Sequence, residues 1–321
     1  MVDPHEYRSR IVEISEHHSG QRLDNFLIAQ LKGVPRSHIY RIVRTGQVRV
    51  NRSRAKPKSR LQLGDHVRIP PIRVATRPSP LITVGQRKVT QRILFEDDYL
   101  FMIDKPAGIA VHAGTTIPAG LIDWLRAARP EQEYLELVHR LDRDTSGCLL
   151  IAKSRNTLIA LQELLRQHTG TRHRIRKSYL ALVKGRWQGG PRHVNVALKK
   201  NMLRSGERLV RVSSDGQRAV SYFRPRVFFE TATLVDVDLI TGRTHQARVH
   251  AAYLGHPIGG DTKYGDKGFN TLMRERGLNR LFLHASRLEF RHPVTRRKIT
   301  VNCPLPKELK SILHELKTDA G

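Results

Sequence analysis

Two short polar clusters in the sequence carry the side chains that could do chemistry. The first, His139–Gly147 in LVHRLDRDTSGCLLIAKS, lies between two apolar runs, which places its polar side chains at the rim of a sheet. Within it, Asp142 is flanked by arginines, and a nearby cation favours an ionised carboxylate that can serve as a nucleophile or a base. A buried structural Asp–Arg pair would give the same pattern, so the cluster alone leaves both interpretations open.

The second cluster is LITGRTHQARVH, in which we predict a strand that leaves a tight turn at Thr241 and Gly242. The alternation after this turn presents four polar side chains, Arg243, His245, Gln246 and Arg248. Arg243 is the predicted partner of Asp142, because a bidentate guanidinium would fix both the orientation and the charge of a carboxylate. The spacing also permits a purely structural role.

The 321 residues carry a formal net charge of +28, far more than solubility requires. This excess predicts a polyanionic partner, either nucleic acid or an anionic membrane. No uninterrupted apolar stretch of about 18 residues occurs, and residues 1–20 hold no secretory segment, so a membrane partner is disfavoured and a cytoplasmic location is expected. The two cysteines, Cys148 and Cys303, have no His or Cys neighbours at metal-ligand spacing, so neither a disulfide framework nor a metal site is indicated.

Residues 20–72 combine helical periodicity with a high density of basic side chains. Leu23, Phe26 and Leu27 recur at helical spacing, a second helix is predicted from Ser37 to Val43, and the runs VRVN and LQLGDHVRIP predict short strands. The arginines around the second helix and the following turn are Arg36, Arg41, Arg44, Arg49, Arg52 and Arg54. They could follow RNA phosphates with little sequence reading, although a solvated basic face would have the same composition.

From residue 91 onward, short apolar runs alternate with loops, as in ILFEDDYLFMIDKP, GCLLIAKS and YLALVKG. Helical patterns are fewer, and the clearest is SRNTLIALQELLRQH. We therefore predict an α+β fold around a large, mixed, mostly antiparallel sheet. The expected domains are an N-terminal extension at 1–19, a basic α/β module at 20–72, a linker with several prolines at 73–90 and a large domain at 91–321.

The basic module resembles the S4 domain of ribosomal proteins and RNA-modifying enzymes in its pieces RLDNFL, SHIYRIVRTGQVRVN and LxxGDxVRIP. The large domain resembles the RluA-type pseudouridine synthases through HRLDRDTSG, the upstream KPAG and the downstream RKSYLALVKG and TGRTHQARVH. The segments GHPIGGDTKYG and RLFLHASRLEF extend this resemblance from about residue 91 to the C-terminus. It implies an enzyme that isomerises uridine in RNA without a cofactor, acting at several sites of bacterial 23S (large-subunit) rRNA. We expect a monomer.

The resemblance also implies roles for individual residues. Asp142 matches the family's catalytic aspartate, Arg243 the arginine that pairs with it, and Tyr179 the tyrosine that lies against the extruded uracil. The hydroxyl of Tyr179 could also assist proton removal from C5. Arg140 corresponds to the arginine that enters the RNA stack when the uridine leaves it, and Asp144 is expected to be a turn residue. Further predicted RNA contacts, each with a supporting role as the alternative, are Lys105, His139, Gln246 and Arg248.

Two other functions remain open from the sequence. One is a non-catalytic RNA-binding factor for ribosome assembly, and the other is a related synthase that acts on tRNA. The set of Asp142, Tyr179 and Arg243 argues against the first. Two departures from the family's pattern also affect the site: Ala247 stands where a larger aliphatic residue is usual, which would leave a roomier uracil pocket, and residues 167–179 form a longer, more basic segment before Tyr179.

Overall fold

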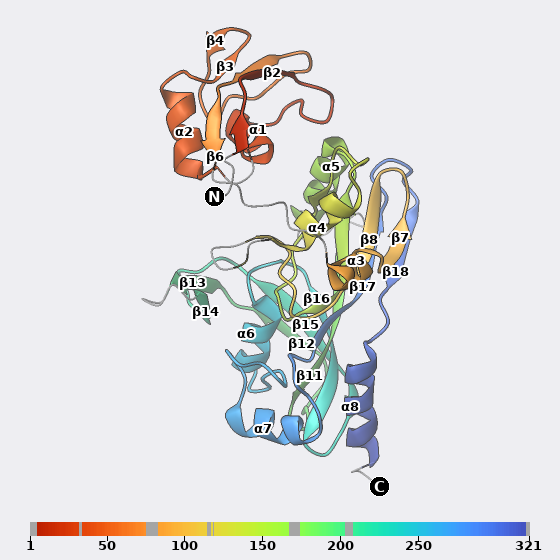
Figure 1. Ribbon diagram of the computed structural model, residues 1–321. Coiled ribbons are helices and arrows are strands. Elements are labelled where there is room, and N and C mark those ends of the chain that lie inside the picture. The colour runs from red at the N-terminus through yellow and green to blue at the C-terminus, as the bar shows by residue number, and fades with distance from the viewer. Residues whose placement is uncertain are drawn as a thin grey trace. The chain divides into compact units, whose positions relative to one another are not determined.

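The computed structural model describes residues 5–31, 34–74, 83–113, 117, 119–166, 174–202 and 208–318 (Figure 1). Contacts between residues divide the chain into two compact units, Met1–Leu81 and Ile82–Gly321, and each is described by itself. The division falls within the predicted linker at 73–90, of which residues 75–82 lie outside the described residues.

The first unit packs two helices against a small antiparallel sheet. Its elements are β1 (His5–Tyr7), β2 (Arg10–Glu13), α1 (Leu23–Gln30), α2 (Arg36–Arg44), β3 (Arg49–Val50), β4 (Ser53–Arg54), β5 (His66–Ile69) and β6 (Ile72–Val74). The sheet has the order β2-β5-β3-β4, and β1 pairs separately with β6. Helix α2 buries Ile39, Ile42 and Val43, which recur at helical spacing and complete a core shared with α1.

The predicted N-terminal extension at 1–19 contains two of these strands. β2 pairs with β5, with Val12 opposite Val67, and Ile14 is buried in the core of the unit. The paired segments are far apart in the sequence. Because strand formation of this kind depends on tertiary pairing, the local pattern around residue 12 does not reveal it.

The second unit is built on a ten-stranded sheet. Its strands are β7 (Ile93–Glu96), β8 (Leu100–Lys105), β9 (Glu136–Leu137), β10 (Ser146–Ala152), β11 (Arg176–Lys184), β12 (Arg192–Asn195), β15 (Val220–Phe228), β16 (Ala232–Leu239), β17 (Leu283–Arg291) and β18 (Lys298–Asn302). The order is β12-β15-β16-β11-β17-β10-β8-β7, with β18 paired to β17 and β9 to β10. Only β10 and β17 run parallel among these described pairs. The predicted α+β fold with a large, mostly antiparallel sheet is confirmed.

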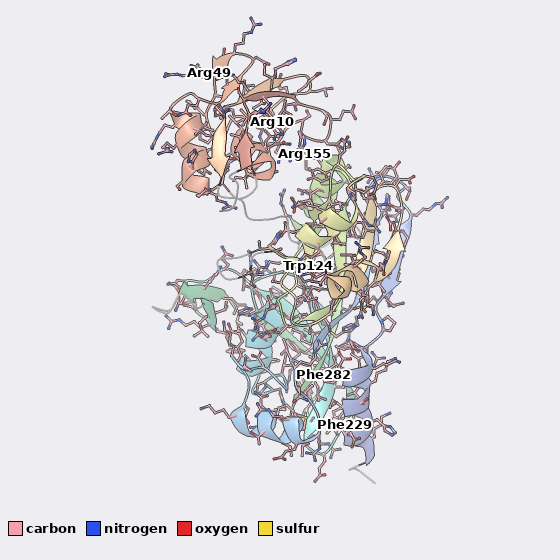
Figure 2. All side chains as sticks on the ribbon, in the orientation of Figure 1. Arg10, Arg49, Trp124, Arg155, Phe229 and Phe282 are labelled. Carbon is pink, nitrogen blue, oxygen red and sulfur yellow. The ribbon has the colours of Figure 1, made fainter. Side chains whose placement is uncertain are left out.

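Helices cover this sheet, and a separate hairpin extends from it. The helices are α3 (Val84–Thr90), α4 (Leu121–Ala128), α5 (Arg155–Arg166), α6 (Gln246–Tyr253), α7 (Lys267–Glu275) and α8 (Lys307–Thr318), and the hairpin joins β13 (Leu198–Met202) to β14 (Arg208–Val212). In Figure 1, α7 and α8 lie toward one end of the sheet and α5 toward the other. Phe229 and Phe282, labelled in Figure 2, belong to the core that α7 and α8 complete. Within the described residues, no helix has both the length and the apolarity that crossing a membrane requires.

The end of the predicted linker is helical, because α3 begins there with a capping box. The backbone N–H of Gln86 donates to Oγ1 of Thr83 at 3.2 Å, and the backbone N–H of Thr83 donates to Oε1 of Gln86 at 2.9 Å. Thr and Gln at this spacing are a signal for a helix start. The neighbouring prolines obscured it in the sequence.

Strand β10 anchors the first polar cluster. Every residue of β10 is buried, and Gly147 lies opposite Ala285 in the parallel pairing with β17. A Cβ atom on Gly147 would lie 2.2 Å from the carbonyl oxygen of Ala285, and the φ angle of Gly147 is +111°. Only glycine fits such a close approach. The loop that enters β10, which contains Asp142, is therefore fixed next to the central strands.

Candidate active site

A pocket of about 330 Å³ lies where β10 begins and β16 ends. It brings together the two polar clusters that the sequence singles out, and β11 supplies part of its wall. Its polar and aromatic lining residues are His139, Arg140, Asp142, Thr145, Arg166, Lys177, Tyr179, Arg243, Thr244, His245, Gln246 and Arg248.

Asp142 lines this pocket with 19% of its side chain exposed. Its carbonyl oxygen accepts a hydrogen bond from the backbone N–H of Thr145 at 3.2 Å, which closes a tight turn before β10. Two basic groups approach its Oδ2 atom at 3.9 Å each, Nη1 of Arg248 and Nε2 of His245. Asp142 is thus a partly exposed carboxylate beside a guanidinium, an arrangement that suits a nucleophile or a base.

Arg248 is held in place by Asp261. Nε of Arg248 donates to Oδ2 of Asp261 and Nη2 donates to Oδ1, both at 2.7 Å, and both side chains are buried. Oδ1 of Asp261 also accepts from the backbone N–H groups of Lys263 and Tyr264. Burial opposes the ionisation of Asp261, but Arg248 and these N–H groups hold its pKa below the usual value. The bidentate pair therefore gives the remaining nitrogen, Nη1, a fixed direction toward Asp142.

Arg243 does not take the position predicted for it. Within the described residues its side chain is exposed, its Nε donates to the carbonyl oxygen of Arg218 at 3.2 Å, and it makes no ion pair with Asp142. The predicted strand after the turn is instead helix α6, and Arg248 lies on that helix beside the carboxylate. We predicted the two-residue repeat of a strand after the turn, but the chain follows the 3.6-residue repeat of a helix. This difference explains why Arg243 rather than Arg248 was paired with Asp142.

Gln246 stabilises this turn, and its side-chain amide has no hydrogen-bonding group left to contact RNA. It is 2% exposed, and its Oε1 accepts from Oγ1 of Thr241 at 2.6 Å and from the backbone N–H of Arg243 at 3.0 Å. Its Nε2 donates to the carbonyl oxygen of Val220 and to Oγ of Ser221. The whole hydrogen-bonding capacity of the amide is used inside the protein, so the supporting role replaces the predicted RNA contact.

His245 joins Asp142 to a second network. Its φ angle of 54° is left-handed, a conformation that residues other than glycine rarely adopt outside constrained sites. Its Nδ1 forms a 2.7 Å hydrogen bond with the hydroxyl of Tyr264, which also accepts from the backbone N–H of Val210 at 3.0 Å. Burial lowers the pKa of His245, while the charge of Asp142 opposes that shift. Nδ1 of His245 is thus hydrogen-bonded to Tyr264, while Nε2 faces Asp142 from 3.9 Å.

Lys105 is a buried brace rather than a surface contact. Its Nζ donates to the carbonyl oxygens of Pro106, Ile109 and Arg143 at 2.8, 2.8 and 2.9 Å. The side chain is fully buried, and burial lowers its pKa to about 7. The predicted RNA contact is corrected for this reason. Because Arg143 follows Asp142 directly, Lys105 ties the loop of the carboxylate to the end of β8.

His139 and Arg140 are adjacent but have different surroundings. Nε2 of His139 accepts a hydrogen bond from the backbone N–H of Leu150 at 3.2 Å, and burial, together with the charge of Lys177, lowers its pKa to about 4. His139 is thus neutral near pH 7 and supports the loop. Arg140 is exposed, and no hydrogen bond or ion pair engages its side chain within the described part of the chain. Its guanidinium is available to a ligand at the pocket.

Tyr179 lies on β11, opposite Val237 of β16 and Ala285 of β17, and is 6% exposed. It lines the pocket together with Asp142. Burial, reinforced by the charge of Asp142, raises the pKa of its hydroxyl above the usual value. The hydroxyl therefore stays protonated at neutral pH, which makes it a hydrogen-bond donor and a weak base.

The two departures noted in the sequence have different outcomes. Ala247 lies in the first turn of α6 and lines the pocket, so its small side chain does border the space that a base would enter. Residues 167–173 of the basic segment lie outside the described residues.

The arginines of the first unit lie on α2 and on the hairpin that follows it. The exposed ones are Arg36, Arg41, Arg44, Arg52 and Arg54, whereas Arg49, labelled in Figure 2, is half-buried. Arg49 and Arg52 line a second pocket of about 530 Å³ with Asn51, His66 and Arg68. A turn at Asn51 and Arg52, both with positive φ, joins β3 to β4 and presents this basic surface.

Sequence reasoning missed three residues that line or support the pocket of Asp142. Asp261 and Tyr264 lie in GHPIGGDTKYG, where an acid and a tyrosine in a glycine-rich segment were the available signals. Lys177 is two residues before Tyr179 on β11. Nothing in the local pattern distinguishes this buried lysine from its solvated neighbours.

Comparisons with known proteins agree with this geometry. The RNA pseudouridylate synthase family matches residues 99–253, which contain both polar clusters, and the S4 domain family matches residues 21–67. The chain is 52% identical over 311 residues to ribosomal large subunit pseudouridine synthase C of Haemophilus influenzae, an alignment that covers 96% of this chain and 95% of that protein. It is 49% identical over 313 residues to the protein of the same name from Escherichia coli, covering 96% and 97%.

A solved structure gives the same assignment. The human protein RNA pseudouridylate synthase domain containing 4 superposes with a TM-score of 0.59 at 27% identity, over 73% of this chain and 96% of that one. Together with the two bacterial relatives, this match confirms both resemblances found in the sequence. The chain belongs to the RNA pseudouridylate synthase family and carries an S4 domain.

Proposed function

We propose that this chain isomerises uridines of bacterial large-subunit rRNA to pseudouridine, with Asp142 as the catalytic carboxylate. The observation that carries the proposal is the placement of Asp142 in the pocket, with Nη1 of Arg248 and Nε2 of His245 each 3.9 Å from Oδ2. The names of the bacterial relatives support large-subunit rRNA as the substrate.

The reaction breaks the bond between ribose C1′ and uracil N1 and joins C1′ to C5 of the same base. The carboxylate of Asp142 either adds to C1′, as in covalent glycosidase chemistry, or removes the proton from C2′ to give a glycal. Both routes use the ionised form. Arg248 attracts and orients that form, and Asp261 prevents Arg248 from turning away.

The reacting atoms of a stacked uridine are hidden, so the base must leave the stack before Asp142 can reach it. Arg140, exposed beside the pocket, is the side chain that we assign to the space left in the RNA. Tyr179 is assigned to the extruded uracil, against which its ring would pack. Its raised hydroxyl pKa favours packing and hydrogen-bond donation over removal of the C5 proton.

The S4 domain is proposed to add affinity through the arginines of α2 and of the β3–β4 turn. These side chains are positively charged and mostly exposed, which suits contacts with phosphates. We further propose that the enzyme acts as a monomer in the cytoplasm. The proposed ribosomal substrate supports the location in the cytoplasm.

Pseudouridine mapping of rRNA and tRNA from cells that lack this protein tests the proposal. Loss at defined large-subunit positions, restored by the wild-type gene and not by Asp142→Asn, is the expected result. Restoration by Asp142→Asn would favour the non-catalytic assembly factor. Loss confined to tRNA would favour the tRNA-acting synthase. Sedimentation of the purified protein would measure its oligomeric state.

A further inference from the structure

Lys177 is a buried cation of the pocket that the mechanism above does not use. It lies on β11 two residues before Tyr179, so both side chains point to the same face of the sheet. Both line the pocket, and Lys177 is 8% exposed. The amine therefore belongs to the wall of the same pocket that Tyr179 lines, next to Gly242.

The surroundings of Lys177 offer its amine no counter-ion. Within the described residues, its Nζ has no hydrogen-bond or ion-pair partner, and the charged neighbour that acts on it is another cation, Arg174. Burial, followed by the charge of Arg174, lowers the pKa of Lys177 to about 8. A cation on a largely buried side chain that lacks a counter-ion is expected to gain an acceptor from the ligand that enters the pocket.

Space for that amine is preserved by Gly242. A Cβ atom on Gly242 would lie 3.3 Å from Nζ of Lys177, closer than most such contacts. Any side chain at this position would therefore crowd the amine or displace it. The turn after β16 thus leaves Nζ of Lys177 open toward the pocket.

The depth of Lys177 favours a base over a phosphate as its ligand. A phosphate group is strongly hydrated and belongs to the RNA backbone, whereas the extruded base is the part that must enter the pocket. Uracil is neutral when bound, but when the C1′–N1 bond breaks, the electron pair of that bond goes to the ring and spreads over N1, O2 and O4. An ammonium within hydrogen-bonding reach of one of these oxygens would interact more strongly with the transition state than with the bound substrate.

We propose that Lys177 is a further catalytic residue, whose ammonium donates a hydrogen bond to a carbonyl oxygen of the extruded uracil and stabilises the charge that develops there. This inference rests on the proposed function. No new bond forms at Lys177, and its proton remains on the amine. The contribution belongs to the chemical step rather than to RNA binding.

The first test compares Lys177→Met with Lys310→Met in single turnovers at saturating RNA. Lys310 is exposed on α8, so both variants lose one positive charge and attract RNA equally at long range. We expect the rate of Lys177→Met to fall on the order of 100-fold, the usual effect of removing one preorganised donor, with RNA affinity little changed. Lys310→Met should keep the wild-type rate.

Stability separates this role from a structural one. Nζ of Lys177 makes no hydrogen bond or ion pair within the described residues, and methionine keeps the apolar packing of the buried stem. Lys177→Met should therefore unfold at the same temperature as the wild type or higher. A lower melting temperature together with slow turnover would overturn the proposal in favour of a packing role. A wild-type rate for Lys177→Met would also overturn it.

The second test identifies the oxygen by replacing the target uridine with 2-thiouridine or 4-thiouridine. Sulfur is a poorer hydrogen-bond acceptor than oxygen. One of these substitutions should therefore lower the single-turnover rate of the wild type, and it should not lower the rate of Lys177→Met any further. Coupling to a phosphorothioate instead would overturn the uracil assignment. A failure of the proposed function is recognised separately: in that case Asp142→Asn retains turnover, whatever the rate of Lys177→Met.

Discussion

Nη1 of Arg248 lies 3.9 Å from Oδ2 of Asp142 because Asp261 holds the rest of the guanidinium through two 2.7 Å hydrogen bonds. The orientation of the carboxylate that we propose as catalytic thus depends on an acid that does not line the pocket. Asp261 is itself fixed by backbone N–H groups of the glycine-rich segment that contains Tyr264. Asp142, Arg248 and Asp261 form one continuous chain of charges.

Asp261→Asn tests whether this chain supports catalysis. The change leaves the buried guanidinium of Arg248 without its charged partner, and removing one member of a buried pair destabilises a protein by about 3–5 kcal/mol. A displacement of Arg248 near 1 Å would slow turnover by about 100-fold. Urea unfolding and single-turnover rates measure the two effects. Asp266→Asn makes the same charge change at the start of α7 and should keep the rate, so equal rate losses in the two variants would refute the role of Asp261.

Asp142→Asn against Asp144→Asn tests the choice of carboxylate. Asp144 is 42% exposed, and its Oδ1 accepts a hydrogen bond from Nε of the adjacent Arg143 at 3.1 Å, so it is expected to be dispensable. Asp142→Asn removes the nucleophile or base but keeps the shape and most of the positive field. Turnover should disappear in Asp142→Asn, with RNA affinity little changed, and persist in Asp144→Asn. The opposite ranking in a pseudouridine assay would show that the wrong acid was chosen.

Arg140→Ala tests the role assigned to base extrusion. If the guanidinium fills the space left by the uridine, its loss leaves the cost of unstacking uncompensated in a helix, whereas an unpaired uridine carries little of that cost. The single-turnover rate on a hairpin should fall roughly tenfold or more relative to the rate on an unpaired oligonucleotide. Arg166→Ala is a suitable control, because Arg166 also lines the pocket but is paired with Glu163. Equal losses on both RNAs for Arg140→Ala would remove the assignment.

The pKa of Lys177 predicts how stability depends on pH. Burial and Arg174 lower this pKa from 10.5 to about 8, so between these values the unfolded chain holds a proton that the folded chain has released. Stability of the wild type relative to Lys177→Met should therefore rise with pH through this window, by up to about 3 kcal/mol. His139 has a pKa of about 4 and stays neutral across the same range. Parallel unfolding curves for the two proteins from pH 8 to 10 would contradict the shift.

The sequence was sufficient for the fold class and for part of the pocket. Asp142, Arg140 and Tyr179 all line it. The cluster that contains Asp142 was a local signal, because it follows an apolar run, whereas Arg140 and Tyr179 were identified through the family resemblance. The pairing of Asp142 could not be predicted, since it depended on whether the chain after Gly242 continues as strand or begins a helix. The burial of Lys105 and Lys177 could not be predicted either, because both lysines have ordinary sequence neighbours. Only the folded sheet shows that the amine of Lys105 donates to three carbonyl oxygens, whereas the amine of Lys177 has no such partners in the described part of the chain.

Tyr179→Phe and Tyr179→Ala separate the two chemical roles of this tyrosine. Its hydroxyl, with a pKa raised by burial and by Asp142, is held in the protonated form and is poorly suited to accept the C5 proton. The ring, by contrast, lines the pocket and can pack against the base. We therefore expect Tyr179→Phe to retain most of the single-turnover rate on both a hairpin and an unpaired oligonucleotide. Tyr179→Ala should lose far more, because it removes the packing surface and leaves a cavity between Val237 and Ala285. A strong kinetic isotope effect with C5-deuterated uridine that appears in the wild type and changes in Tyr179→Phe would show instead that the hydroxyl takes part in proton removal.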